Sequence, residues 1–349
     1  MSRFTFIVKP VSINCNLGCT YCYHGWLTEK QGKLDVMTRE ALKMFFSTLA
    51  ALEQKDVEII WHGGEPLLAG KEFFRDVVEE ELKVSKNITN LIQTNGILLD
   101  EEWVHILKRG RFKIGISIDG PEDIHDFYRV SRSGMPTFKV VEKKIRMLRD
   151  LRVPVGPVSV VSKRSVPYGK EIFSFLYDMG LKKMNFSPCP DLGMSYAVTG
   201  KEYGEFLLTV FREWIRLDDP DVKIVPLSSF MQVLIGGRPT VCHHQADCSN
   251  FLSVDADGSI YVCGRSVGVE SRKIGNIKTQ GFEDISKGDR YLSIKHDMSN
   301  ISTECKSCGW LPACNNGCPL NRDDKGKYLL CHAIKMVLPE MKKVVGKSL

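Results

Sequence analysis

The stretch that decides the fold is CNLGCTYC at residues 15–22, which places cysteines at Cys15, Cys19 and Cys22. It follows an apolar run at residues 4–11 that has the composition of a buried strand. Three thiolates at C-x3-C-x2-C spacing suit a four-iron cluster, in which they leave one iron open to another molecule. A structural zinc site with a remote fourth ligand is the alternative, but zinc sites usually contain paired C-x2-C units. The stretch therefore predicts an iron–sulfur site after the first strand.

Strand and helix patterns alternate through the first half of the chain. Short apolar runs that end in turn residues predict six strands, at residues 4–11, 57–61, 88–92, 112–118, 153–161 and 183–186. Helical spacing predicts helices between them, at residues 42–52, 73–82, 103–107, 140–151 and 172–179, with Thr38 as an N-cap. Six such units predict an α/β fold, a partial (β/α)6 TIM-like barrel whose chemistry lies at the carboxyl ends of the strands.

The second half has a different pattern. An amphipathic helix at about 203–217 predicts a linker, and regular periodicity is lost after Pro226. Residues 251–263 predict a hairpin that turns at Asp257 and Gly258. We therefore predict one domain at residues 1–225 and a second at residues 226–349.

Eight more cysteines lie in this second domain: Cys242, Cys248, Cys263, Cys305, Cys308, Cys314, Cys318 and Cys331. Eight thiolates can fill two four-iron clusters and leave no open coordination position, which favours electron transfer over direct substrate binding. A zinc ribbon is the alternative that a single C-x2-C pair would allow. A segment so poor in apolar periodicity needs metal to hold it.

Composition excludes several classes of function. The 349 residues are 43% hydrophobic and 26% charged, with a net charge of +6. No apolar run approaches the length of a membrane span, and the amino terminus lacks the core of a signal peptide. Twelve cysteines without an export signal predict a reduced, cytoplasmic protein. The mild charge predicts neither nucleic-acid nor membrane binding.

Further motifs come in a specific order after the first cysteine loop. They are GGEP at 63–66, QTNG at 93–96, SIDGP at 117–121, HDFYR at 125–129 and GMPTF at 134–138. With CNLGCTYC, they resemble the radical S-adenosylmethionine family over nearly the whole chain. The second cysteine group resembles the C-terminal SPASM module of peptide-modifying members of that family.

This resemblance implies S-adenosylmethionine and three [4Fe-4S] clusters, one of them bound by the first three cysteines. Glu65 would accept hydrogen bonds from the cofactor's amino group, and Arg129 would grip its carboxylate. The residues implied to contact the cofactor are Tyr21, Gly64, Glu65, Ser117, Asp119, Arg129 and Pro190. One auxiliary cluster would take Cys242, Cys248, Cys263 and Cys318. The other would take Cys305, Cys308, Cys314 and Cys331.

The chain resembles the anaerobic sulfatase-maturating enzymes, which make formylglycine from Cys or Ser, but departs from them at one position. In that subfamily a catalytic aspartate follows the cysteine on the returning strand of the hairpin, and here Gly264 follows Cys263. Glycine cannot take a proton. Asp247, His243, His244 and Glu270 are candidate substitutes. Cys189, at the end of the sixth strand, is a further candidate, although a buried inert thiol is its simpler interpretation.

We therefore predict an enzyme that abstracts hydrogen from a peptide or protein side chain, giving an oxidised or crosslinked residue as ribosomal-peptide maturases do. Formylglycine formation is the disfavoured alternative. A non-catalytic iron–sulfur or zinc scaffold is the second alternative. The expected partners are the substrate and an electron donor of the flavodoxin or ferredoxin type.

Overall fold

The computed structural model describes residues 4–25, 35–189, 194–245, 248 and 251–348. The chain forms two compact units, each built from separate stretches of sequence. The first comprises Met1–Ser117, Tyr128–Val155 and Cys248–Asp297, and the second comprises Ile118–Phe127, Gly156–Asp247 and Met298–Leu349. The division at residue 225 stays a prediction. Within the described residues, no helix has both the length and the apolar character to cross a bilayer.

The first unit contains strands β1 (Phe4–Lys9), β2 (Asp56–Trp61), β3 (Asn87–Thr94), β4 (Lys113–Ser117), β8 (Phe251–Asp255), β9 (Ser259–Tyr261) and β10 (Lys273–Asn276). Their order is β10-β9-β8-β1-β2-β3-β4. Strands β1 to β4 and β8 are parallel, whereas β8, β9 and β10 pair antiparallel. The predicted hairpin is confirmed as β8 and β9, and its first strand extends the parallel sheet beside β1. The carboxyl ends of β1, β2, β3 and β8 therefore meet at one edge.

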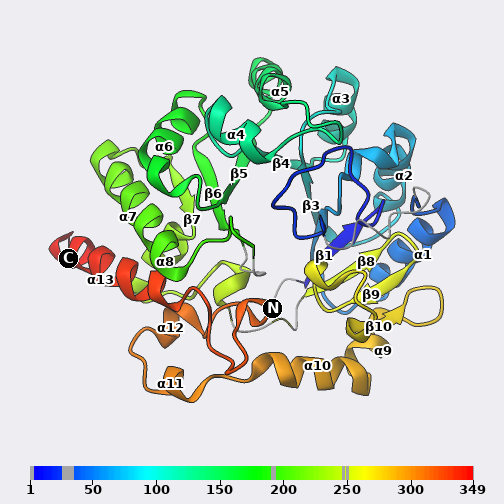
Figure 1. Cartoon of the computed structure of the whole chain (residues 1–349). Coiled ribbons are helices and arrows are strands. Elements are labelled where there is room, and N and C mark those ends of the chain that lie inside the picture. Colours follow the sequence, from blue (N-terminus) through cyan, green and yellow to red (C-terminus); the bar gives the residue numbers. More distant parts are fainter. Residues whose placement is uncertain (1–3, 26–34, 190–193, 246–247, 249–250, 349) are drawn as a thin grey trace. The chain divides into compact units, whose positions relative to one another are not determined.

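The helices of this unit are α1 (Arg39–Ala50), α2 (Lys71–Glu81), α3 (Glu101–Arg109), α5 (Phe138–Asp150), α9 (Phe282–Lys287) and α10 (Asp289–Ser299), the last two residues of α10 belonging to the second unit. Short 3-10 turns are η2 (Pro66–Ala69), η5 (Gly264–Ser266) and η6 (Glu270–Arg272). Figure 1 shows α1, α2 and α3 along the outer side of the strands. Thr38 caps α1 as predicted, since its hydroxyl accepts from the Ala41 amide at 3.2 Å.

The two faces of β1 differ sharply. Phe6 packs its ring against Phe45 of α1 and Phe282 of α9, with ring centroids 5.5 and 4.5 Å away. Side chains alternate along a strand, so Ile7 and Lys9 lie on the opposite face. The aromatic face fixes β1 against its helices, and the other face is left for the site.

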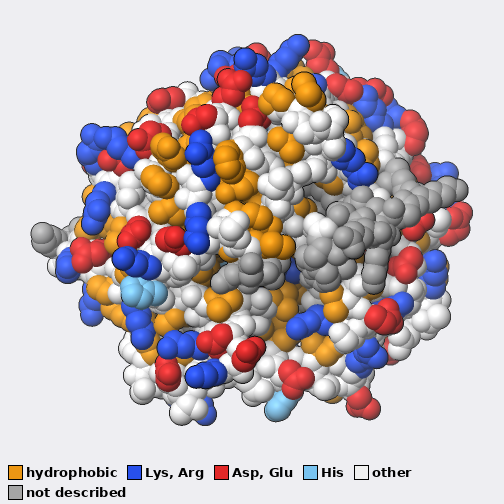
Figure 2. Space-filling view, in the orientation of Figure 1, with side chains coloured by type: hydrophobic (Ala, Val, Ile, Leu, Met, Phe, Trp, Pro, Cys, Tyr) orange, Lys and Arg blue, Asp and Glu red, His pale blue; other side chains and the backbone are white. Residues whose placement is uncertain are grey.

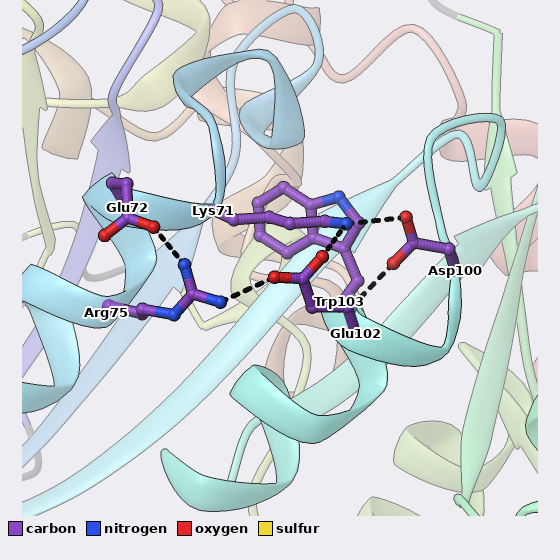
Figure 3. A network of polar contacts seen from close by, with 6 residues as sticks. All are labelled: Lys71, Glu72, Arg75, Asp100, Glu102 and Trp103. Atoms are coloured by element: carbon purple, nitrogen blue, oxygen red, sulfur yellow. Dashed lines mark hydrogen bonds and ion pairs between the residues drawn. The ribbon is translucent and has the colours of Figure 1, made fainter.

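An ion-pair network joins α2 to α3 (Figure 3). Lys71 Nζ lies 2.7 Å from Asp100 Oδ2 and 2.5 Å from Glu102 Oε2. Arg75 bridges Glu72 and Glu102. Asp100 also caps α3 by accepting from the Trp103 amide at 2.8 Å. These pairs are solvent-exposed, so they orient the helices more than they stabilise them.

The second unit contains strands β5 (Val155–Val161), β6 (Lys183–Pro188) and β7 (Lys223–Val225), in that order and parallel. Its helices are α4 (Glu122–Tyr128), α6 (Gly169–Asp178), α7 (Gly200–Leu217), α8 (Leu227–Leu234), α11 (Thr303–Lys306), α12 (Leu311–Cys314) and α13 (Cys331–Ser348). The last residue of α4, Tyr128, and the first residue of β5, Val155, belong to the first unit. Its 3-10 turns are η3 (Val166–Tyr168), η4 (Cys242–His244) and η7 (Pro319–Asn321). All six predicted strands are present as β1 to β6, whereas β7 and β10 were not predicted.

Helix α7 is the predicted linker helix and packs closely on α13. A capping box of Thr199 and Glu202 begins it. A Cβ at Gly204 would come within 2.9 Å of Met336 Sδ, so the glycine permits the close approach of the two helices.

Charged side chains of both signs are interspersed on the face drawn in Figure 2, in keeping with the small net charge.

Candidate active site

The loop after β1 carries the first three cysteines and is clamped by backbone hydrogen bonds. The Gly18 amide donates to Val130 O at 2.9 Å, and the Thr20 amide donates to Tyr128 O at 3.1 Å. All three cysteines have intermediate exposure. The loop therefore presents them from a fixed backbone.

The three thiols lie near one another. Burial raises the pKa of the Cys15 thiol to about 12, and the charges of Glu65, Cys19 and Cys22 raise it further, against the Leu17 amide, which lowers it. A metal that binds thiolates removes this cost, because it supplies the compensating positive charge. Sulfur donors alone, one for each of three irons, are the donor set of an iron–sulfur cluster with an open iron.

The GGEP loop after β2 is joined by backbone hydrogen bonds to the segment that leads into the cysteine loop. The Gly64 amide donates to Ser12 O at 3.0 Å, and the Glu65 amide donates to Asn14 O at 2.8 Å. A Cβ at Gly64 would lie 1.9 Å from Asn14 O, so only glycine fits there. The sequence motif thus has a steric reason in addition to its resemblance.

Glu65 is fully buried and ties this loop to the next. Its carboxylate accepts from the Leu67 amide at 3.1 Å, the Thr94 hydroxyl at 2.8 Å and the Asn95 amide at 2.7 Å. A carboxylate has about four acceptor positions, so one is left for a ligand's amino group. Burial raises the pKa of Glu65 to about 7, against these hydrogen bonds and the charge of Arg129, which lower it.

Arg129 contacts Tyr21 of the cysteine loop. Arg129 Nη1 donates to Tyr21 Oη at 2.7 Å, and both side chains are buried. The Tyr21 ring packs against that of Tyr128, with centroids 5.4 Å apart. The structure therefore brings together two residues that were predicted separately as cofactor contacts.

The remaining predicted cofactor contacts lie at strand ends. Ser117 ends β4, and its hydroxyl accepts from Gln93 Nε2 at 3.1 Å. In the second unit, Asp119 is buried and accepts from the Val160 amide at 3.0 Å. Pro190 lies outside the described residues. Hydrogen bonds within the chain thus orient Ser117 and Asp119.

Four of the later cysteines gather in the second unit. Burial raises the pKa of the Cys305 thiol, and the charges of Cys331 and Cys308 add to it. Burial likewise raises the pKa of Cys314 to about 12, with Cys331 as the largest charge acting on it. These four are the set predicted for one auxiliary cluster, and the thiols fit its donor chemistry. Cys242 and Cys318 also lie in this unit, whereas Cys248 and Cys263 lie in the first unit.

The candidate bases fare differently. His244 is buried between the rings of Phe230 and Tyr328, and burial lowers its pKa to about 3. It is therefore a neutral, packed side chain. His243 is partly exposed, Glu270 is exposed, and Asp247 lies outside the described residues.

Cys189 is almost fully buried, and its amide donates to Val161 O at 2.8 Å. This burial accords with the simpler interpretation of the residue as an inert thiol.

Sequence reasoning missed a buried polar cluster at the ends of β1 and β8. Lys9 is fully buried, its Nζ lies 3.1 Å from His24 Nε2, and Asp255 is its neighbour across the sheet. The signal in the sequence is the single cation that ends the apolar run FTFIVK.

Parallel strands with thiol sites after the first strand and in the C-terminal segment define the class of radical S-adenosylmethionine enzymes that carry an iron–sulfur SPASM domain. The sequence matches the radical SAM superfamily over residues 10–163 and the SPASM iron–sulfur cluster-binding domain over residues 242–309. The chain belongs to this superfamily, in the family that includes the anaerobic sulfatase-maturating enzymes.

Two relatives carry this assignment. The cysteine-type anaerobic sulfatase-maturating enzyme of Clostridium novyi is 29% identical over 93% of this chain and 90% of its own length. The serine-type enzyme of Bacteroides thetaiotaomicron is 30% identical over 90% of this chain and 82% of its own length. The chain is thus an enzyme that binds S-adenosylmethionine and iron–sulfur clusters.

Solved structures agree. Native anSMEcpe with bound AdoMet matches with a TM-score of 0.90 and 26% identity over 98% of this chain and 99% of its own. The same protein has been solved with AdoMet and the Cp18Cys peptide, again with a TM-score of 0.90. The predicted fold class, a partial (β/α)6 barrel with a C-terminal SPASM domain, is confirmed.

Proposed function

We propose that this enzyme abstracts a hydrogen atom from a side chain of a peptide or protein and leaves an oxidised or crosslinked residue. When S-adenosylmethionine is bound to its cluster and the cluster is reduced, the pair would supply a 5′-deoxyadenosyl radical. The protein positions the reactants and excludes water. Relatives described as acting on sulfatases, and one solved with a peptide, support a peptide or protein substrate.

We propose three four-iron clusters. Cys15, Cys19 and Cys22 would hold the cluster that binds S-adenosylmethionine. Two auxiliary clusters would take the sets Cys305, Cys308, Cys314, Cys331 and Cys242, Cys248, Cys263, Cys318. The mutual charges among the described thiols of the first two sets support them. An electron donor of the flavodoxin or ferredoxin type would reduce the enzyme.

The proposed cofactor contacts follow from the hydrogen-bond inventory. Glu65 has one acceptor position left for an amino group. The guanidinium of Arg129 is buried and oriented by its hydrogen bond to Tyr21, and it would grip the carboxylate of the cofactor. Ser117 and Asp119 would contact carboxylate or ribose, Gly64 would allow a close backbone approach, and Pro190 would line the site. Because Glu65, Ser117 and Arg129 are held by hydrogen bonds within the first unit, these side chains would be oriented before the cofactor arrives.

One observation separates this proposal from formylglycine formation. Gly264 is buried, and a Cβ there would lie 3.0 Å from Ile7 Cγ2 of β1. An aspartate at this position is missing from the sequence, and a side chain there would require Ile7 to shift by a few tenths of an ångström. The relatives' names favour formylglycine formation, which we keep as the second candidate.

Anaerobic reconstitution with iron and sulfide, followed by chemical reduction in the presence of S-adenosylmethionine, tests the proposal. We expect about twelve irons per chain and release of 5′-deoxyadenosine. Incubation with Cys and Ser peptides and trapping with a hydrazine then separates the candidates, because only an aldehyde product reacts. Bound zinc without release of 5′-deoxyadenosine would contradict the proposal and favour a non-catalytic metal-binding scaffold.

A further inference from the structure

Lys9 is a buried ammonium with too few partners. It is fully buried at the end of β1, and among the described residues its hydrogen-bond acceptor is His24 Nε2 alone, at 3.1 Å. An ammonium has three donors, and a buried charge needs compensation. His24 is itself buried, and its Nδ1 has no partner among the described residues. Within the described residues, Lys9 and His24 therefore have hydrogen-bonding positions without partners in the protein interior.

The charges that act on Lys9 show which groups lie near its ammonium. Burial lowers the pKa of Lys9 to about 8, whereas Asp255, Cys263 and Cys22 raise it, in that order. Lys9 thus lies within electrostatic reach of one thiol from the first cysteine loop and one from the hairpin. The Tyr23 ring, with its centroid 5.9 Å from Nζ, closes another side.

No carboxylate neutralises the ammonium by direct contact. Asp255 is its cross-strand neighbour, but within the described part of the chain no ion pair joins them within 4 Å. Asp255 instead accepts from the Ser12 hydroxyl at 3.2 Å and from the Ala256 amide at 2.9 Å. The charge of Lys9 is therefore available to other anions.

We propose that Lys9 is an electrostatic positioning residue that stabilises negative charge on the metal groups held by Cys22 and Cys263, and so raises their reduction potentials. This rests on the proposed function, since it requires clusters at these thiols. A fixed charge in a low-dielectric interior acts strongly over a few ångströms, and reduction adds negative charge to a cluster. Full burial keeps Lys9 away from solvent screening.

The test compares reduction potentials by spectroscopic titration of the reconstituted enzyme. Lys9→Met and Lys9→Gln remove the charge, and the Gln variant keeps an N–H donor for His24. Lys9→Arg keeps the charge. Lys113→Met removes a charge from the exposed start of β4 and serves as the control. We expect both neutral variants to shift to more negative potentials, with Lys9→Arg and the control near the wild type.

Unchanged potentials in loaded Lys9→Met or Lys9→Gln would overturn the proposal. Loss of iron from both neutral variants, with Lys9→Arg loaded, would support it, since the charge would then be needed to hold the clusters. Loss of iron from Lys9→Arg as well would assign Lys9 to packing and overturn it. Failure of the wild type itself to bind iron would sink the proposed function instead, so the two failures are distinguishable.

Discussion

The side-chain amide of Asn95 donates to Cys15 Sγ at 3.7 Å and to Asn16 Oδ1 at 2.8 Å. Its backbone amide donates to Glu65, so one residue of the QTNG loop joins the cysteine loop to the GGEP loop. The motif therefore has a physical role: it orients the Cys15 thiol from the end of β3, which lies two strands from β1 in the sheet.

Asn95→Ala should weaken metal binding at the first cysteine loop. Loss of a group that orients a metal ligand typically costs about 10–100-fold in metal affinity. Iron retention under a chelator measures this directly. Asn87→Ala is the matched control, because Asn87 begins the same strand and donates to exposed Asp56. Equal iron retention in both variants would contradict the role of Asn95.

Glu65 should make the stability of the metal-free protein depend on pH. Burial raises its folded-state pKa from 4.5 to about 7, so the folded protein holds this proton more tightly than the unfolded chain does. The contribution of Glu65 to the free energy of unfolding is fully present below about pH 4.5 and is lost as the pH rises through about 7. Glu65→Gln removes this titration.

The free energy of unfolding in urea, measured for wild type and Glu65→Gln across that range, checks the sign. We expect the wild type to lose stability relative to the variant as the pH rises. Parallel curves for the two proteins would show that the carboxylate titrates alike in the folded and unfolded states.

Much of this architecture could be predicted from local sequence patterns. Strands β1 to β6 follow from spacing within short stretches. The assignment of thiols to particular clusters is implied by the family resemblance and stays a prediction. Contacts between distant stretches could not be predicted in this way. Lys9 and Asp255 become neighbours only because β8 joins the sheet beside β1, and Asn95 reaches Cys15 across 80 residues. Strand order in a sheet is set by tertiary packing, which periodicity does not encode.

Cys305→Ser and Cys331→Ser should remove iron from the same auxiliary cluster. Each variant should lose up to about four irons per chain, and the double variant should lose no more than either single variant. Cys189→Ser is the control, because that thiol is buried and outside both sets. Additive losses in the double variant would place Cys305 and Cys331 in different clusters.

Gly264 should be constrained by its contact with Ile7. A Cβ at residue 264 would lie 3.0 Å from Ile7 Cγ2 and 3.3 Å from Cδ1, so the Ile7 side chain would have to shift by a few tenths of an ångström. Overpacking of this kind typically costs about 1–3 kcal/mol, so Gly264→Ala should lower the free energy of unfolding by that amount.

The same substitution in an Ile7→Ala background should cost much less, because the clashing methyl groups are gone. Urea unfolding of the two single variants and the double variant yields the coupling energy. A strong coupling would mean that the packing of β1 keeps a side chain, and with it an aspartate, from position 264. Additive effects would show that Ile7 does not restrict the side chain at position 264. The absence of an aspartate there would then be the one feature at this position that disfavours formylglycine formation.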